Sequence, residues 1–427
     1  MSNGRRTARR GRPALNGAAI TVRMYNVGFG DAFLVRLPGP ERPLRILFDC
    51  GSIGAAEGRP MDKVVTQIIK DCEDDDGHSR IDVVVATHRH RDHISGFANA
   101  AWDDVEVKEV WLPWTEDPDD ADAARIRRAQ RGMALGLAPT FAAASEDPAL
   151  PEASRNRIKD LAEIVFNASV SVNDAAMVRL HEGFAGNARR RFLPEKPPVN
   201  ATFETPTLPG VVVHAMGPSR SEAVIRDLEP PAGASYFSLG ELNGDRQAEA
   251  PQPFRDDWTT ERNDIGDLAL APDDEATLAA YGVDSDLAVA VALDKAINGT
   301  SLMLSLEIEG RVLLFPGDAQ WGTWNEVLAD ERWKKLLKRA EFYKIGHHGS
   351  HNATPRTFVD ERLGEGVLAM ASVKPKSNWP EIPRKPLFQA LLEHDAHIAR
   401  SDQSNQAPRE FFSAQGQEWI ETKIPLD

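Results

Sequence analysis

Cysteine is scarce in this chain: of its 427 residues only Cys50 and Cys72 are cysteines. Two thiols cannot build the multi-disulfide framework of a small secreted protein, so we expect a fold held by its hydrophobic core in the reducing cytoplasm. The sequence also lacks an uninterrupted apolar run of the ~20 residues that a membrane helix requires. No apolar segment follows the basic N-terminus, as it would in a secretory signal, so we expect neither a membrane span nor secretion.

Positive charge is also in short supply. The chain has 50 Lys and Arg against 65 Asp and Glu, which gives a formal net charge of -15. Such a surface repels polyanions unless positive charge is local. It is local in "RRTARRGRP", within residues 1–19, which we interpret as a disordered, solvated tail. The alternative is an arm that contacts the phosphates of nucleic acid.

What the chain does contain is two series of apolar strand segments, typical of a soluble α/β protein. The first series precedes a segment with a helical charge pattern (residues 116–190), and the second surrounds an acidic, Pro- and Gly-rich segment (residues 220–287). We interpret both segments as insertions. The predicted strands are residues 20–28, 31–37, 44–51, 81–88, 107–114, 210–219, two strands within 300–318 joined by the turn at 309–311, 341–350 and 366–373. The predicted helices outside the insertions are 61–72, 322–340 and 385–395.

The stretch "THRHRDHISGF" carries the strongest chemical signal. It follows a short apolar strand and places three of the chain's 11 histidines beside an aspartate. Because alternate residues of an extended segment face one way, His88 and His90 can bind one metal ion. Asp92 and His93 come where the chain would turn into a helix and can face a second ion. The alternative is a polar loop with chance histidines, which this density of ligands disfavours.

Two later stretches can complete such a site. Asp318 follows an apolar strand in "VLLFPGDAQ" and offers a carboxylate that could bridge two ions. His347 and His348 follow another strand in "YKIGHHGS" and can complete the second metal site. All three clusters lie at the carboxyl ends of predicted buried strands, where sheet-based enzymes commonly build their sites.

These phrases, together with "VGFGDAFLV", "ILFDCGS" and "NGTSLMLSLEIEGRVLLFPGD", resemble the metallo-β-lactamase fold superfamily. Within it, the likeness is to the hydrolase domain of competence-type DNA-uptake proteins. The resemblance implies a four-layer αβ/βα sandwich over residues 20–427, in which two mixed sheets pack face to face with helices outside and a metal cleft at one edge. It covers neither insertion.

The resemblance also implies roles for individual residues, with two divalent metal ions as cofactors, zinc first and manganese as the alternative. The first ion would be held by His88, His90 and Asp318, and the second by Asp92, His93, Asp318 and one of His347 and His348. Asp49 would support the ligand loop, and Asp31 would lie near the site. Asn298 and Ser301 would pack beneath it, and Ser350 would hydrogen-bond a substrate oxygen.

Two positions depart from the family pattern. Many members place a further histidine between the first cluster and the Gly-Asp, whereas here only His181 and His214 lie in that interval. We expect a structural role for both, which leaves the first metal short of a protein ligand, weakly held or completed by water. A histidine expected before a proline near the end is also absent, with Trp379 or Ile382 in its place.

A binuclear centre of this kind predicts hydrolysis by a metal-bridged hydroxide, with Asp318 bridging the ions and Asp92 or a neighbouring histidine shuttling a proton. The leading hypothesis is a phosphodiesterase or nuclease acting on nucleic acid or a nucleotide. A second is hydrolysis of a small ester, lactone or lactam. A third is a catalytically silent, metal-braced module that binds a protein partner through its insertions.

Overall fold

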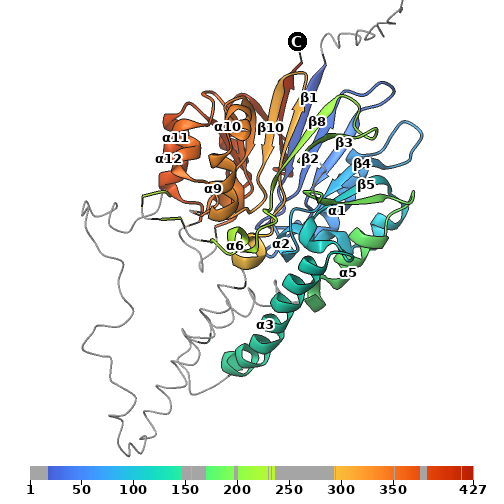
Figure 1. Cartoon of the computed structure of the whole chain (residues 1–427). Helices are drawn as coiled ribbons and strands as arrows, with labels where there is room; N and C mark the ends of the chain where they lie inside the picture. The colour runs from blue at the N-terminus through green and yellow to red at the C-terminus, as the bar shows by residue number, and fades with distance from the viewer. Residues whose placement is uncertain are drawn as a thin grey trace, which may run out of the picture.

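The computed structural model describes residues 18–146, 155, 170–196, 201–228, 230–231, 233–235, 293, 295–350, 352–375, 382–414 and 416–426. Within them the chain forms two mixed β-sheets with helices on their outer faces (Figure 1), which confirms the predicted α/β sandwich. The basic stretch of the predicted tail and most of the predicted acidic insertion lie outside the described residues.

The first sheet is antiparallel at one end and parallel at the other. Strands β14 to β3 pair antiparallel, and β3 to β6 pair parallel. Its order is β14 (Phe411–Ser413), β15 (Trp419–Pro425), β1 (Ala19–Tyr25), β2 (Phe33–Leu37), β3 (Leu44–Phe48), β4 (Arg80–Val85), β5 (Glu106–Pro113) and β6 (Arg189–Leu193).

The second sheet has the same two-part construction. Strands β13 to β10 pair parallel, and β10 to β7 pair antiparallel. Its order is β13 (His397–Arg400), β12 (Leu368–Ala371), β11 (Ala340–Lys344), β10 (Arg311–Phe315), β9 (Met303–Ile308), β8 (Val211–Gly217) and β7 (Thr202–Glu204). Each sheet therefore contributes parallel strands whose carboxyl ends can carry ligands.

Helices cover the outer face of each sheet. On the first sheet lie α1 (Met61–Asp71) and α5 (Val170–Glu182), and on the second lie α9 (Trp321–Ala329), α10 (Glu331–Leu337), α11 (Arg356–Glu361) and α12 (Lys385–Glu393). At the strand ends lie α2 (Arg91–Ile94), α6 (Glu222–Ile225) and the long α3 (Ala121–Glu146). Short 3₁₀ turns are η1 (Ser95–Ala98), η2 (Ala100–Asp104), η3 (Trp114–Glu116), η6 (Gly346–Gly349) and η7 (Ser401–Gln406).

Three apolar clusters hold these four layers together. One fills the space between the sheets, where Phe48 of β3 stacks on Phe315 of β10 with ring centroids 3.9 Å apart. A second packs the outer face of the second sheet against α9, α10, α11 and α12. A third packs the outer face of the first sheet against α1, α5 and η1. Because central strands are covered on both faces, they are apolar almost throughout rather than alternating.

Among the differences from the sequence prediction, two arise inside predicted helical segments. The helix predicted over residues 322–340 is divided into α9 and α10, because Asp330 accepts a hydrogen bond from the N–H of Arg332 at 2.8 Å and caps a new helix. The predicted helical insertion ends in a strand, since Arg189 begins β6 and extends the first sheet beside β5. Among the described residues, no helix has the length and apolar character needed to cross a bilayer.

Candidate metal centre

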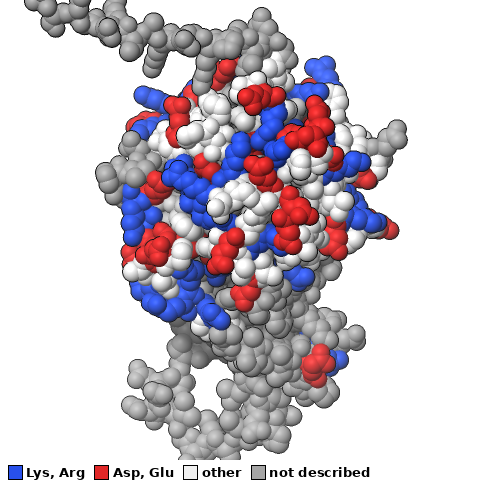
Figure 2. All heavy atoms as spheres, turned by 90° about the vertical axis from the view of Figure 1, so that its right-hand side faces the viewer, with Lys and Arg blue, Asp and Glu red and all other residues white. Residues whose placement is uncertain are grey.

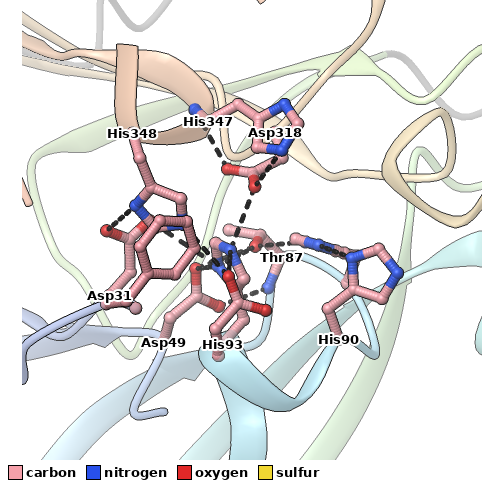
Figure 3. A network of polar contacts seen from close by, with 12 residues as sticks. Asp31, Asp49, Thr87, His90, His93, Asp318, His347 and His348 are labelled. Carbon is pink, nitrogen blue, oxygen red and sulfur yellow. Dashed lines mark hydrogen bonds and ion pairs between the residues drawn. The ribbon is translucent and has the colours of Figure 1, made fainter. Parts of the chain in front are cut away.

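The carboxyl ends of parallel strands in the two sheets meet at one edge of the sandwich. In the first sheet, Asp49 follows β3 and His88 follows β4, and the two strands run parallel. In the second, Asp318 follows β10 and His347 follows β11, again in parallel. Figure 3 shows the side chains from both sheets pointing toward one another.

Four of the predicted ligands form one compact donor group: Asp92, His93, Asp318 and His348. Their donor atoms all lie within 4.8 Å of one another, and all four residues are buried. His348 Nε2 is 3.0 Å from Asp92 Oδ2, and His93 Nε2 is 3.1 Å from Asp318 Oδ2. Between them, His93 Nε2 is 3.6 Å from Asp92 Oδ2.

These spacings fit a divalent cation. Two ligands of one tetrahedral zinc with bonds of 2.0–2.1 Å lie about 3.3 Å apart. The three donor separations of 3.0, 3.1 and 3.6 Å bracket that value, and imidazole nitrogen with carboxylate oxygen is a donor set that zinc and manganese accept. The arrangement therefore suits an ion at the junction of the two sheets.

His88 and His90 form a second, separate pair. His88 Nε2 lies 3.0 Å from His90 Nδ1, the spacing expected of two ligands on one ion. Within the described residues, however, this pair does not join any third donor in a group as compact as the first. His90 is also hydrogen-bonded by the side chain of Asn298, which is buried.

His347 and His348 occupy different places around Asp318. His348 is fully buried and reaches Asp92, while its Nδ1 lies 2.8 Å from the backbone carbonyl of Ser372. His347 is 18% exposed, and its Nε2 is 3.9 Å from Asp318 Oδ2. The geometry therefore groups His348, rather than His347, with Asp92 and His93.

A carboxylate behind His93 fixes the ring. Asp49 Oδ2 lies 2.8 Å from His93 Nδ1, which leaves Nε2 directed at Asp318. Asp49 is itself held by the N–H and hydroxyl of Thr87, at 2.7 and 2.8 Å. A carboxylate on the far nitrogen of a ligating histidine orients the ring and makes it a stronger ligand.

Three residues of the centre have left-handed backbone conformations. Asp49 has a φ of 55°, and the consecutive residues His347 and His348 have φ of 45° and 51°. A left-handed conformation destabilises a residue with a β-carbon by roughly 1–2 kcal/mol. Two consecutive left-handed histidines therefore strain this loop. Backbone strain of this kind concentrates at functional sites.

Glycines let two further loops approach the Asp92 backbone. A β-carbon on Gly30 would lie 2.6 Å from the carbonyl oxygen of Asp92, and one on Gly51 would lie 2.5 Å from that of Arg91. The N–H of Asp31 donates to the Asp92 carbonyl at 2.9 Å, so this contact is part of a regular hydrogen-bonded junction. The early "GFGD" and "DCG" motifs therefore pack directly on the ligand loop.

Buried charge dominates the centre. Burial alone would lower the pKa of His93, but the carboxylates of Asp318, Asp92 and Asp49 raise it well above its usual value. Burial would raise the pKa of Asp318, yet His93 and Lys344 hold it well below the ordinary range. The raised pKa of His93 favours its protonated form, whose positive charge compensates the surrounding carboxylates.

The His88–His90 pair has the opposite character. Burial, reinforced by the neighbouring His93 and His90, lowers the pKa of His88 well below its usual value. Burial also lowers the pKa of His90 to about 4. Both imidazoles are therefore neutral at pH 7, which is the form that binds metals.

Part of the helical insertion holds this histidine pair. Arg89, between the two histidines, makes a two-point ion pair with the buried carboxylate of Glu116 in η3. The Nδ2 of Asn173 in α5 donates to the backbone carbonyl of Arg89 at 2.8 Å. The insertion is thus packed against the ligand loop, which the sequence did not predict.

The remaining predicted residues lie at varying distances from the donors. Ser301 is fully buried, and the hydroxyl of Ser350 donates to Asn352 rather than facing open space. His181 stacks on Phe192, and His214 contacts Thr202 and Glu307, so the structure places neither in the donor group. Ile382 lies just before Pro383, which packs near Gly349 of η6, whereas Trp379 lies outside the described residues.

Sequence reasoning missed Lys344. It is the last residue of β11, is buried, and forms ion pairs with Asp31 and Asp318. A lone lysine at the end of the apolar segment "EFYKIG" was the available signal, because a buried ammonium requires paired carboxylates.

Comparison with known proteins gives one partial match to report. A stretch of 107 residues, 25% of this chain, is 27% identical to ComE operon protein 3 of Bacillus subtilis (strain 168). The match covers only 13% of that protein's length. No family model matches the chain. The partial match and the two-sheet architecture together fit a metallo-β-lactamase-like fold.

Proposed function

We propose that this protein is a metal-dependent hydrolase of the metallo-β-lactamase superfamily with a binuclear centre, and that it cleaves phosphodiester bonds in nucleic acid or a nucleotide. The observation that carries the proposal is the buried group of Asp92, His93, Asp318 and His348, contributed by loops of both sheets. The partial likeness to ComE operon protein 3 agrees with the competence-type motifs.

The metal ions that such a centre takes, zinc or manganese, would supply a hydroxide nucleophile at neutral pH and positive charge opposite the transition state. Asp92, His93, Asp318 and His348 would hold one ion. His88 and His90 would hold the other together with Asp318. The strong local field of such ions reduces the need for a basic protein surface.

The protein's own groups set the protonation of the site. Burial would raise the pKa of Asp92, but His93 and His348 lower it strongly, so its carboxylate stays ionised and suited to binding a cation. For the same reason Asp92 would hold a transferred proton only briefly before releasing it to the leaving group. Asp49 keeps His93 oriented throughout.

The charge pattern of the visible surface gives only limited electrostatic attraction for a polyanionic substrate. Figure 2 shows basic and acidic side chains interspersed on the described part of one face, without a continuous basic stripe there. Recognition of a polyanion would then depend on the metal centre and on the arginines of residues 1–19, which lie largely outside the described residues.

Hydrolysis assays with matched variants test the proposal. Protein loaded with Zn²⁺ or Mn²⁺ is offered single- and double-stranded DNA, RNA and a chromogenic phosphodiester, beside a lactam and a lactone. We expect turnover of the phosphodiesters, reduced more than about 100-fold by Asp92→Ala and by His88→Ala. His397→Asn is the control, because His397 is 41% exposed and pairs with Glu410 rather than with the centre.

Each other outcome assigns a different function. Turnover of the lactam or lactone alone would make the protein a hydrolase of small cyclic substrates. Binding of metal without turnover of any substrate would favour a metal-braced interaction module. Cleavage that survives both Asp92→Ala and His88→Ala would come from a contaminating enzyme and would remove the support for the proposal.

A further inference from the structure

Lys344 places an ammonium group inside the candidate metal centre. Its side chain is 4% exposed, and its Nζ forms an ion pair with Asp31 Oδ2. The same nitrogen lies 3.3 Å from Asp318 Oδ1 and 3.3 Å from the carbonyl oxygen of Gly317. A lysine ammonium has three N–H donors, and three acceptors surround this one.

These contacts divide the two oxygens of Asp318 between different partners. Oδ1 accepts from Lys344 and from the backbone N–H of His347, the latter at 3.1 Å. Oδ2 faces His93 Nε2 at 3.1 Å, on the side of the donor group. The carboxylate of Asp318 is thus held through Oδ1, while Oδ2 faces the donor group.

We propose that Lys344 is a positioning residue of the centre, which fixes Asp318 so that the carboxylate binds metal through Oδ2 alone. This inference rests on the proposed function, since it assigns a role to Lys344 within that metal site. A carboxylate free to rotate could turn either oxygen toward a metal, whereas one with Oδ1 already bonded would offer only Oδ2 to the centre.

A simpler role must be distinguished from positioning. Lys344 could do no more than neutralise Asp31, which is buried and close to His93 and His348, at 3.6 and 3.9 Å. Removing the lysine alone does not separate the two roles, because it leaves Asp31 as an uncompensated buried charge and destabilises the protein in either case.

The double substitution Lys344→Met with Asp31→Asn separates them. It removes one positive and one negative charge, so the net charge of the centre is unchanged and no isolated carboxylate remains at position 31. Only the hydrogen bond from Lys344 to Asp318 Oδ1 is lost from the ligand itself. Far-UV circular dichroism and thermal melting establish that the double variant is folded.

Two measurements on the full-length protein then decide. Zinc dissociation constants are obtained by competition with a chromophoric chelator, and the visible spectrum of the Co²⁺-substituted protein reports its coordination. Positioning predicts that the double variant binds zinc about tenfold more weakly, the scale of a lost second partner of a ligand, and that the Co²⁺ spectrum changes. Asp31→Asn alone is measured in parallel, because Asp31 lies beside His93 and His348, and positioning predicts a smaller spectral change in this single variant than in the double variant.

A wild-type zinc affinity and Co²⁺ spectrum in the double variant would overturn the inference and leave Lys344 as a neutralising partner of Asp31. If the Met variant does not fold, Lys344→Gln with Asp31→Asn is measured in the same way, with the same spectral change expected. If the wild-type protein binds neither ion, the proposed function fails and this inference fails with it. Metal binding by the wild-type protein thus separates the two failures: without it the proposed function fails, and with it only the role of Lys344 is in question.

Discussion

The two ligand loops of the centre reach the same place by different backbone routes. The loop after β4 enters α2 regularly, and His90 stands before the helix in an extended conformation. The loop after β11 turns through two consecutive left-handed histidines. The first loop is supported from behind by Asp49 and the insertion. The second is supported by Asp318, whose Oδ1 accepts from the N–H of His347, and by the Ser372 carbonyl beside His348.

This difference shows which features of a site are visible in a sequence. Alternating histidines on an extended segment are a local pattern, so spacing alone identifies them. A strained loop is fixed by tertiary contacts that no spacing records. Substitutions that break one loop, or that compare the two, therefore measure the contribution of each, and the residue at which the loops meet should matter most.

Asp318→Asn should have the largest effect. Asp318 comes from the second sheet and contacts His93 of the first, so losing its charge removes a ligand from the centre. Zinc affinity should fall by more than about 100-fold, because even outer partners of metal ligands contribute 10–100-fold. Competition with a chelator measures this, and a decrease of less than about tenfold would show that the two loops do not share an ion at Asp318.

His348→Gln and His347→Gln compare two neighbours within the second loop. His348 Nε2 is 3.0 Å from Asp92 Oδ2, whereas His347 Nε2 is 3.9 Å from Asp318 Oδ2 and its side chain is partly exposed. We expect zinc affinity to fall about 100-fold for His348→Gln and no more than about tenfold for His347→Gln. Equal losses measured under the same conditions would contradict the geometric assignment of His348.

Gly51→Ala should break the packing behind the first loop. Its β-carbon would lie 2.5 Å from the Arg91 carbonyl oxygen and 2.6 Å from the Asp92 carbonyl carbon, so the loops must separate. Overpacking of this kind typically costs about 1–3 kcal/mol of unfolding free energy. Urea unfolding measures the loss. Gly132→Ala, where nothing lies within 4 Å, is the control and should not lose stability.

The gain in stability on zinc binding should increase from pH 7 to pH 9. The pKa of His93 in the metal-free protein is raised well above 6.5, and carboxylates likewise raise that of His348 against the effect of burial. Protonation therefore stabilises the metal-free fold fully below pH 6.5 and less as pH rises through the raised pKa values. Zinc binding displaces these protons, so the gain in stability on zinc binding increases as the pH rises.

Melting temperatures with and without saturating zinc, taken at several pH values, test this dependence. His93→Gln removes the titrating group with the strongest carboxylate surroundings, and its difference between zinc-loaded and metal-free melting should vary less with pH. A zinc effect in the wild-type protein that is constant from pH 7 to pH 9 would contradict protonation of these histidines in the metal-free centre.

Asn173→Ala should have the smallest effect. Asn173 donates a hydrogen bond from α5 to the Arg89 carbonyl, and a bond of this kind contributes about 1 kcal/mol. We expect a decrease of a few-fold in zinc affinity and a similarly small loss of stability. Val178→Ala, at an exposed position of the same helix, should change neither. A tenfold or larger loss of affinity would mean that the insertion controls the centre more strongly than one bond implies.

Much of the fold could be predicted, because its central strands are nearly continuous apolar segments and its ligands follow them directly. The C-terminal closure could not. The strand β15 pairs with β1 along its whole length, from Ala19 opposite Pro425 to Tyr25 opposite Trp419, and nothing local in the sequence records so distant a pairing. Similarly, β6 was hidden in the predicted insertion, because its run of three arginines at residues 189–191 resembles the charged helical face before it.

The candidate site was predictable as a set of residues but not as a geometry. The histidine and aspartate motifs named the donors, and the structure then brought four of them into one compact group. Three other features of the site were not predicted: the separation of the His88–His90 pair from the main donor group, the ion pair of Arg89 with Glu116, and the buried ammonium of Lys344. They depend on contacts between segments that lie far apart in the chain. Spacing within a motif carries no information about such contacts.

Metal content per chain tests the central claim most directly. The wild-type protein and a His88→Ala/His90→Ala double variant are dialysed against Zn²⁺ and then against metal-free buffer, and bound zinc is counted by elemental analysis. The account predicts two ions per chain in the wild type and one in the double variant, held by Asp92, His93, Asp318 and His348. A folded wild-type protein that retains no zinc would contradict it.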